Sequence, residues 1–326
     1  MIISRTPMRM SFFGGGTDFP EFFREHTGAV ISTTFDKYCH VNVREIPINL
    51  FEYKTYLSYA KIEKVNSTDE IQHPAIRNAM KWLDLENVCL NYDADLPAKT
   101  GLGTSSAFSV GMLNAFYQMK GIEKNKRELA DGAIHLERTL CREDGGLQDQ
   151  IACAFGGFNR IDFSSDGYTV TPIAFSDGKK QQLNDNLMLF FTGLSRFSFQ
   201  IQKTTKQMLK PKEKNLLKIL SMVDEAEKIL TKPDRSLSDF GLLLNETWQQ
   251  KRNISAEIST DYINSSYQKA IDAGALGGKL LGAGGGGCLL FYVEKDKQED
   301  VRKALSDMHE IKFRFENEGT KIICND

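Results

Sequence analysis

Glycines and hydroxyl side chains come together in one segment, Pro97-Ala98-Lys99-Thr100-Gly101-Leu102-Gly103-Thr104-Ser105-Ser106-Ala107. Gly101 and Gly103 let the backbone turn tightly and approach a ligand without a Cβ in the way. The Thr-Ser-Ser run opens a predicted helix, where free N–H groups and the helix dipole favour an anion. Because Gly-Lys-Ser/Thr is missing, this is not a Walker A loop. The segment predicts a phosphate-binding loop of another kind; the alternative is a capped helix after an ordinary loop.

Five glycines fall among the ten residues of a second segment, Lys279-Leu280-Leu281-Gly282-Ala283-Gly284-Gly285-Gly286-Gly287-Cys288. The G-x-G-x-x-G spacing is that of dinucleotide-binding proteins, but a predicted strand follows it where a helix is needed. Each glycine weakens regular structure by up to about 1 kcal/mol relative to alanine. We therefore expect Gly284, Gly285 and Gly286 to approach a ligand or another loop closely; the alternative is a flexible surface loop.

A third segment joins a cation to an acidic residue. Arg9 lies in a predicted strand over residues 1–13, which leads into Gly14-Gly15-Gly16-Thr17-Asp18. An arginine suits phosphate, and a carboxylate among glycines suits hydroxyl groups. The alternative is that Thr17 or Asp18 caps the short helix that follows.

Two more carboxylates could have different roles, one binding a metal ion and the other accepting a proton. Glu137 lies in a predicted helix over residues 126–141, and Asp149 follows a Gly145-Gly146 turn. For Glu137 taken alone, a solvated helix face is an equally good explanation.

The elements that must position these residues change in kind along the chain. Strands are predicted at 29–44, 55–65, 88–92, 157–163, 168–173 and 187–191, with helices at 73–85 and 104–119. Residues 197–272 are expected to be almost wholly helical, and a strand pair is expected within 311–323. The pattern predicts an α+β protein of two lobes, a strand-rich one over residues 1–185 and a helix-rich one over 186–326.

Composition narrows the class of partner and the compartment. The chain has 326 residues and a formal net charge of −2, which argues against a nucleic acid or membrane bound through bulk electrostatics. Its six cysteines show no zinc spacing, and no signal peptide or membrane span is apparent in the sequence. We expect a cytoplasmic protein whose oligomeric state is left open, a dimer included.

Taken in this order, the three glycine-containing segments resemble those of the GHMP kinases, which include galactokinase, homoserine kinase, mevalonate kinase and phosphomevalonate kinase. The resemblance implies the two-lobed GHMP kinase fold, with ATP and Mg²⁺ as cofactors. By position, Arg9 matches the cation near the transferred phosphoryl group, and Asp149 the proposed general base. Glu137 matches the acidic metal ligand. Ser105 matches the metal-binding serine, but the motif reads Gly103-Thr104 where the family has Gly-Ser, so Ser106 competes for that role.

Within the family, the Gly-Gly-Gly-Thr-Asp form resembles the heptose 7-phosphate kinase branch. Gly15 and Gly16 replace the glutamate and histidine of galactokinase, so galactose is not expected. The resemblance implies phosphorylation of an anomeric hydroxyl for nucleotide-activated heptose synthesis, with Gly16, Thr17 and Asp18 on the sugar. Arg196 and Arg142 are then expected to hold the acceptor's own phosphate. The alternatives are a fucokinase-like sugar 1-kinase, a non-sugar acceptor such as mevalonate, and a non-catalytic nucleotide-binding regulator.

Overall fold

The computed structural model describes residues 1–194 and 198–326, and its larger sheet is built around two long strands, β1 and β2. The main path of this sheet runs β13-β1-β2-β5-β3-β4, while β12 and β6 also pair with β2, and β7 pairs with β6. Its nine strands are β1 (Ile2–Phe13), β2 (Gly28–Glu45), β3 (Thr55–Ser58), β4 (Ile62–Val65), β5 (Val88–Ala94), β6 (Phe158–Ser164), β7 (Gly167–Pro172), β12 (Phe315–Glu316) and β13 (Lys321–Asn325). The register of β1 on β2 shifts between Pro7 and Met8, where a residue without an N–H interrupts the ladder. The shift falls just before Arg9.

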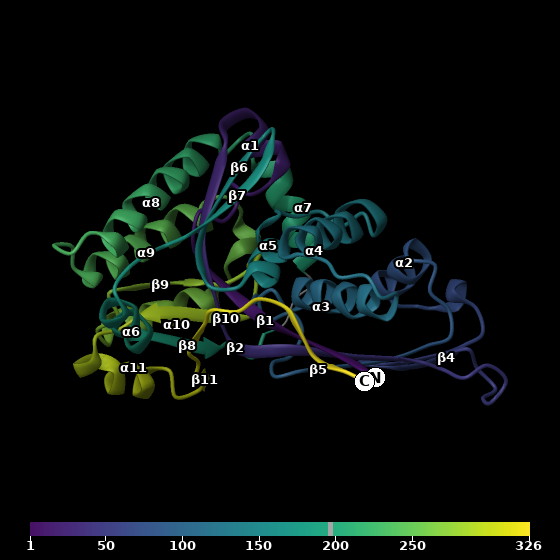
Figure 1. Cartoon of the computed structure of the whole chain (residues 1–326). Helices are drawn as coiled ribbons and strands as arrows, with labels where there is room; N and C mark the ends of the chain where they lie inside the picture. The colour runs from purple at the N-terminus through teal and green to yellow at the C-terminus, as the bar shows by residue number, and fades with distance from the viewer. Residues whose placement is uncertain (195–197) are drawn as a thin grey trace.

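The smaller sheet belongs to the second lobe and is wholly antiparallel. Its order is β11-β8-β10-β9, from β8 (Leu187–Phe191), β9 (Gly277–Leu280), β10 (Cys288–Tyr292) and β11 (His309–Ile311). The second lobe also contains α7 (Ser198–Met208), α8 (Glu213–Thr231), α9 (Leu237–Arg252), α10 (Asp261–Asp272) and α11 (Gln298–Ala304). Figure 1 shows α8 and α9 side by side on the opposite side of β1 from α3 (Thr104–Met119) and α4 (Lys126–Ile134).

Helices of the first lobe cover one face of the larger sheet (Figure 1). They are α1 (Pro20–His26), α2 (Pro74–Trp82), α3 (Thr104–Met119), α4 (Lys126–Ile134) and α5 (Gln148–Phe155). Helix α6 (Asp177–Asn186) comes later in the chain and leads to β8. Helix α3 is buried along most of its length, which explains its apolar character all round. It packs on β1 and β2 and so fixes the start of the helix beside Arg9.

The two lobes share part of their hydrophobic core. One cluster of buried side chains contains residues from both lobes. Its members include Met8, Met10 and Phe12 of β1, Leu244 of α9 and Leu290 of β10. The last two strands also return to the larger sheet, where β12 pairs with β2 and β13 with β1. The larger sheet therefore includes residues from both sides of the 185/186 division, which itself stays a prediction.

Some predicted elements differ in detail. The N-cap of α1 is Phe19, with no side-chain cap, so neither Thr17 nor Asp18 caps that helix. The helix expected over 126–141 changes after α4 into a π-helix, His135–Leu140. Helix α6 was not expected. The strands near 311–323 do not pair with each other; they pair with strands from earlier in the chain, in both sheets.

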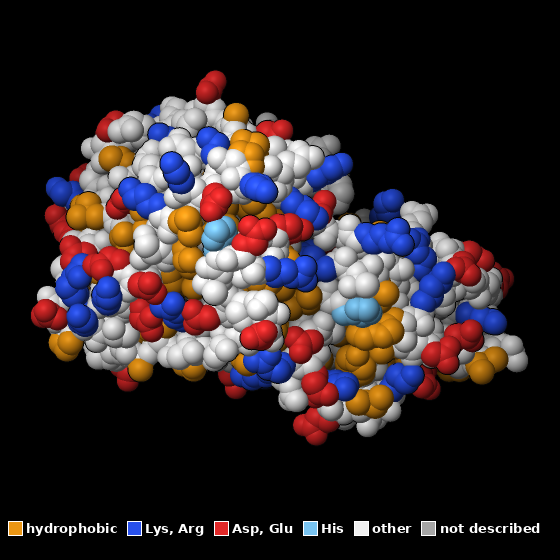
Figure 2. Space-filling view, turned by 90° about the horizontal axis from the view of Figure 1, so that it is seen from above, with side chains coloured by type: hydrophobic (Ala, Val, Ile, Leu, Met, Phe, Trp, Pro, Cys, Tyr) orange, Lys and Arg blue, Asp and Glu red, His pale blue; other side chains and the backbone are white. Residues whose placement is uncertain are grey.

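The surface carries charges of both signs. On the face in Figure 2, lysines and arginines are interspersed with aspartates and glutamates, without a stripe of one sign. No helix in the described part of the chain combines the length and the apolar character that crossing a membrane would require.

Candidate active site

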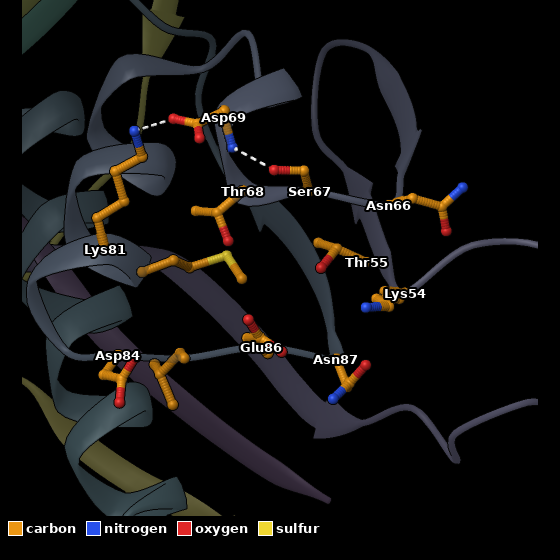
Figure 3. Close-up of a pocket in the computed structure, with 12 residues that line it drawn as sticks. Lys54, Thr55, Asn66, Ser67, Thr68, Asp69, Lys81, Asp84, Glu86 and Asn87 are labelled. Carbon is orange, nitrogen blue, oxygen red and sulfur yellow. Dashed lines mark hydrogen bonds and ion pairs between the residues drawn. The ribbon is translucent and has the colours of Figure 1, made fainter.

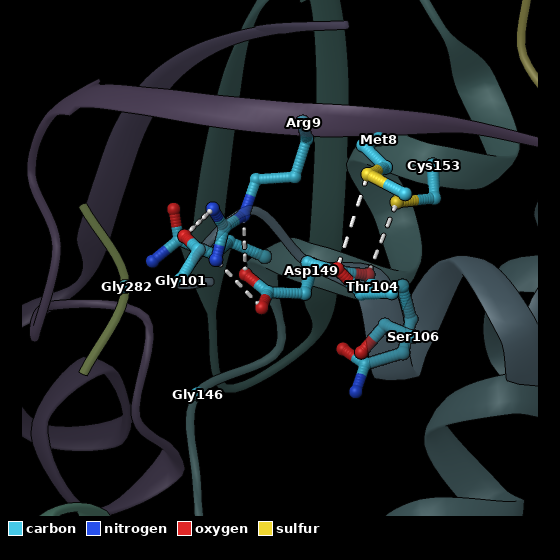
Figure 4. A network of polar contacts seen from close by, with 12 residues as sticks. Met8, Arg9, Gly101, Thr104, Ser106, Gly146, Asp149, Cys153 and Gly282 are labelled. Atoms are coloured by element: carbon cyan, nitrogen blue, oxygen red, sulfur yellow. Dashed lines mark hydrogen bonds and ion pairs between the residues drawn. The ribbon is translucent and has the colours of Figure 1, made fainter. Parts of the chain in front are cut away.

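Arg9 and Asp149 form the centre of the site. The guanidinium binds the carboxylate through two contacts, Nε to Oδ1 at 2.8 Å and Nη2 to Oδ2 at 2.7 Å. Nη1 donates to the carbonyl of Gly101 at 2.8 Å, so the arginine also touches the first glycine-rich loop (Figure 4). Arg9 is only 3% exposed, whereas the Asp149 side chain is 24% exposed and keeps an open side. Residues 140 positions apart are thus held in one planar, charge-assisted pair.

The first glycine-rich loop turns into α3 directly beside this pair. Gly101 and Gly103 have φ of +77° and +74°, which an L-residue with a side chain rarely adopts. A Cβ on Gly103 would lie 2.9 Å from Cγ of Arg9. Leu102 is buried under the loop, while Pro97 and Lys99 are exposed at its start. The free N–H groups at the start of α3 therefore lie next to Arg9, as an anion site requires.

The second glycine-rich segment packs on this loop. A Cβ on Gly282 would lie 2.5 Å from Cα of Gly101, and one on Gly287 would collide with the carbonyl of Thr100. Gly284 and Gly285 contact Ile258, and Gly286 faces the carbonyl of Leu194. The expected close approach to another loop is therefore observed, and Gly282 and Gly287 join the two lobes; cofactor binding by Gly284, Gly285 and Gly286 stays a prediction.

Glu137 lies on the π-helix, an irregularity that is frequent at functional sites. Its side chain is almost fully buried, and its Oε2 accepts hydrogen bonds from Ser106 Oγ at 3.2 Å and from Gln150 Nε2. Its Oε1 is buried without a hydrogen-bond partner in the described part of the chain. Burial raises the pKa of Glu137, which the nearby Arg138 opposes.

These features fit a divalent cation held partly by the protein. A buried carboxylate oxygen without a partner is costly unless a ligand or ion fills the position. Across the described residues there is no group of three or more His, Cys, Asp or Glu side chains suited to a metal. Mg²⁺ is usually bound through one or two carboxylates together with phosphate oxygens, so Glu137 and a serine are a sufficient protein contribution. Of the two competing serines, Ser106 faces Glu137 and Ser105 is exposed.

Asp18 lies near the Arg9–Asp149 pair, close enough for the charges to affect one another. It is 2% exposed, with Oδ1 accepting from the N–H of Gly16 at 2.9 Å and Oδ2 from that of Gln148 at 3.3 Å. Burial raises the pKa of Asp18; the hydrogen bond from Gly16 opposes this, and the charge of Asp149 adds to it. Gly146 leaves room for the carboxylate, because a Cβ there would overlap it.

Thr17 does not share this position. Its hydroxyl is fully buried, donates to the carbonyl of Gly14 at 2.8 Å and accepts from the N–H of Ala29 at 3.1 Å. The residue therefore holds the turn that presents Asp18, and its direct contact with the substrate stays a prediction.

Of the two arginines expected to hold an acceptor phosphate, the structure describes only Arg142. Arg196 lies outside the described residues. Arg142 is exposed, with φ of +55°. Arg138, which the sequence analysis passed over, binds the carbonyl of Gly146 at 2.8 Å and so ties the Gly145-Gly146 turn to the helix of Glu137.

Two other residues at the site were missed. Gln150 binds Glu137, and its place one residue after Asp149 was the only available signal. Lys251 binds the carbonyl of Gly282 from the last turn of α9. Basic residues are common at helix C-termini, so nothing in the sequence distinguished this lysine.

A cavity of about 500 Å³ lies elsewhere in the first lobe (Figure 3). It is lined by residues of β3, η1 (Thr68–Glu70), α2 and the turn before β5, and Asp69 is paired there with Lys81. The Lys120 side chain ties the turn at Leu83 to the C-terminal end of α3. The glycine loop is at the other end of this 16-residue helix, about 24 Å away. None of the site residues lines this cavity.

The chain matches the GHMP kinases N terminal domain over residues 71–157 and the GHMP kinases C terminal domain over 222–311. It is 31% identical to D-glycero-alpha-D-manno-heptose 7-phosphate kinase of Campylobacter jejuni, over 98% of either chain. It is 25% identical to L-fucokinase/L-fucose-1-P guanylyltransferase of Bacteroides fragilis, over 93% of this chain and 35% of that protein. A crystal structure of a D-glycero-D-manno-heptose 1-phosphate kinase from Bacteroides thetaiotaomicron, 22% identical, superposes over both whole chains with a TM-score of 0.80 and so shares the fold. The predicted two-lobed α+β fold is confirmed, and the chain belongs to the GHMP kinase family.

Proposed function

We propose that this GHMP kinase uses ATP to phosphorylate the anomeric hydroxyl of D-glycero-D-manno-heptose 7-phosphate. The product would be a 1,7-bisphosphate for nucleotide-activated heptose synthesis. The observation that carries the reaction class is the Arg9–Asp149 pair beside the glycine loop, at the start of α3. The acceptor rests on the similarity to the Campylobacter jejuni heptose 7-phosphate kinase along the whole chain.

Phosphoryl transfer requires positioned phosphates, positive charge on the group in transfer and an oriented acceptor hydroxyl. In this proposal the N–H groups at the start of α3 bind the phosphates, and Arg9 faces the transferred group. Asp149 accepts the proton of the attacking hydroxyl through its open side while Arg9 fixes its orientation. An anomeric hydroxyl is more acidic than an ordinary alcohol, so the proton can leave late and positioning is a large part of the role of Asp149.

Ser106 and Glu137 would hold Mg²⁺, which neutralises charge on the nucleotide phosphates. Asp18, presented by Gly16 and Thr17, would accept hydrogen bonds from the sugar hydroxyls. Its carboxylate already accepts two backbone N–H bonds, which leaves lone pairs for a ligand.

The test is an ADP-coupled assay with MgATP and a panel of heptose 7-phosphate, free heptose, L-fucose, galactose and mevalonate. We expect kcat/KM for heptose 7-phosphate to exceed that for free heptose by at least about 10-fold, the effect of one charge-assisted phosphate contact. Phosphorus NMR of the product should show the new phosphate at C1. A preference for L-fucose would favour the fucokinase-like alternative, and MgATP binding without turnover of any acceptor would favour a regulator.

The metal-binding serine can be identified by mutation. We expect Ser106→Ala to raise the Mg²⁺ concentration for half-maximal activity by about 10-fold, and Ser105→Ala to leave it within 2- to 3-fold, because only Ser106 faces Glu137. Ser109→Ala is the matched control: this buried serine lies one turn further along α3, and its loss should leave that Mg²⁺ concentration unchanged. Magnesium titrations at fixed MgATP show which variant needs more Mg²⁺. A larger effect in Ser105→Ala would make Ser105 the metal-binding serine.

A further inference from the structure

Lys251 brings a second cation to the contact between the two glycine-rich segments. Its Nζ donates to the carbonyl of Gly282 at 2.5 Å, and Gly282 packs directly on Gly101. The carbonyl of Gly101 in turn accepts from Arg9. The ammonium of Lys251 and the guanidinium of Arg9 are therefore bound to two touching glycines, one from each lobe (Figure 4 shows Arg9, Gly101 and Gly282).

The bonding of Lys251 is incomplete. An ammonium has three donors, and Lys251 uses one of them; in residues 1–194 and 198–326 it has neither a second hydrogen bond nor an ion pair. The side chain is only partly buried. It has donors to spare at a point where two lobes and two glycine loops meet.

The charges around Lys251 favour an anion there. Burial and, after it, the charge of Arg9 lower the pKa of Lys251 to about 8, while the charges of Asp18 and Asp149 oppose both effects. Lys279, on β9, is a further charged group near Lys251. Two like charges bound to touching glycines repel each other, and an anion between them would reduce that repulsion.

Lys279 does not qualify for the same role. It is 2% exposed, and its Nζ donates to the carbonyl of Phe12 at 2.7 Å inside the core. Burial, together with the charges of Lys251 and Arg9, lowers the pKa of Lys279 well below its usual value. Of the two lysines, only Lys251 has an open side.

We propose that Lys251 is a catalytic residue of the second lobe that contacts the phosphoryl group during transfer, opposite Arg9. The inference rests on the proposed kinase reaction. In that step the acceptor oxygen bonds to phosphorus as the bond from phosphorus to the bridging oxygen of ATP breaks. The bridging oxygen keeps the electron pair, and the acceptor's proton goes to Asp149. Lys251 stays protonated and supplies charge to the non-bridging oxygens.

The test compares Lys251→Met and Lys251→Arg with wild type, and Lys218→Met is the control. Lys218 is an exposed lysine of α8 that pairs with Glu246 of α9. We expect Lys251→Met to lower kcat roughly 10- to 150-fold, the range for a charge-assisted bond, with the Kd for MgATP within about 3-fold of wild type. The loss should be equal for heptose 7-phosphate and free heptose. In wild type, kcat/KM should fall as pH rises through about 8, and in Lys251→Arg that fall should move to higher pH.

A loss confined to the phosphorylated sugar would place Lys251 on the acceptor's own phosphate and overturn the proposal. So would unchanged kcat with a lower melting temperature, because Lys251 would then only join the lobes. If wild type phosphorylates no acceptor, the proposed function fails, and the slow hydrolysis of ATP by water remains as a separate readout. In that case the same loss in Lys251→Met supports the phosphoryl contact, and an unchanged hydrolysis rate rejects it.

Discussion

Asp149→Asn should bind MgATP within a few-fold of wild type and lose at least about 100-fold in kcat, the low end for a general base. The amide keeps the shape of the side chain but cannot accept a proton. It also cannot offer two oxygens to Arg9, whose Nε and Nη2 both bind this carboxylate. The variant therefore removes the proton acceptor and loosens the cation beside the transferred phosphoryl group. Single-turnover rates and nucleotide binding measured on the same preparation would separate the two steps.

A matched control is available in the first lobe. Arg160 binds Asp162 with its Nε at 2.9 Å from Oδ1, an arginine–aspartate pair that belongs to a surface network with α8. Asp162→Asn should leave kcat within 2-fold, because no site residue touches it. Should Asp149→Asn keep activity near that of Asp162→Asn, Asp149 has no part in the chemistry. If both variants lose MgATP binding, the fold and not the reaction has been changed.

The glycine segments could be predicted because their residue types report local backbone requirements. Gly101 and Gly103 do adopt positive φ, and their place before a helix is visible in the sequence. The choice between Ser105 and Ser106 was not visible. Consecutive helix residues point about 100° apart, so only one can face Glu137, and which one depends on how α3 packs against the π-helix.

Contacts between distant parts of the chain could not be predicted from local pattern. Residues 315–325 look like any short strands, and their pairing with β1 and β2 depends on where the chain end returns. The contact of Lys251 could not be predicted from local pattern either. As a residue of the last turn of α9 it is ordinary, and its importance comes from Gly282, 31 residues later. The family resemblance supplied the expected roles of Arg9 and Asp149, and the structure supplied their pairing.

Gly282→Ala should damage both stability and activity, because Gly282 lies at the contact between the lobes. Gly282 has φ of +77°, and a Cβ there would lie 2.5 Å from Cα of Gly101. The left-handed conformation costs an alanine roughly 1–2 kcal/mol, and moving the packed backbone adds about 1–3 kcal/mol. Because Gly282 also holds Lys251 and Gly101 holds Arg9, the shift should displace both cations. Displacements of about 1 Å at a reacting centre can cost about 100-fold, so we expect kcat/KM to fall at least about 10-fold at a temperature where the variant is folded.

Gly121→Ala isolates the contribution of backbone conformation. Gly121 has φ of +68°, close to that of Gly282, and a Cβ there would meet no atom within 4 Å. This variant should lose about 1–2 kcal/mol in the free energy of unfolding and keep wild-type kcat/KM. Chemical denaturation and steady-state kinetics of the two variants give the comparison. Equal losses of stability and equal activity would show that the approach of Gly282 to Gly101 contributes nothing to the phosphate site, because only the cost of positive φ would remain.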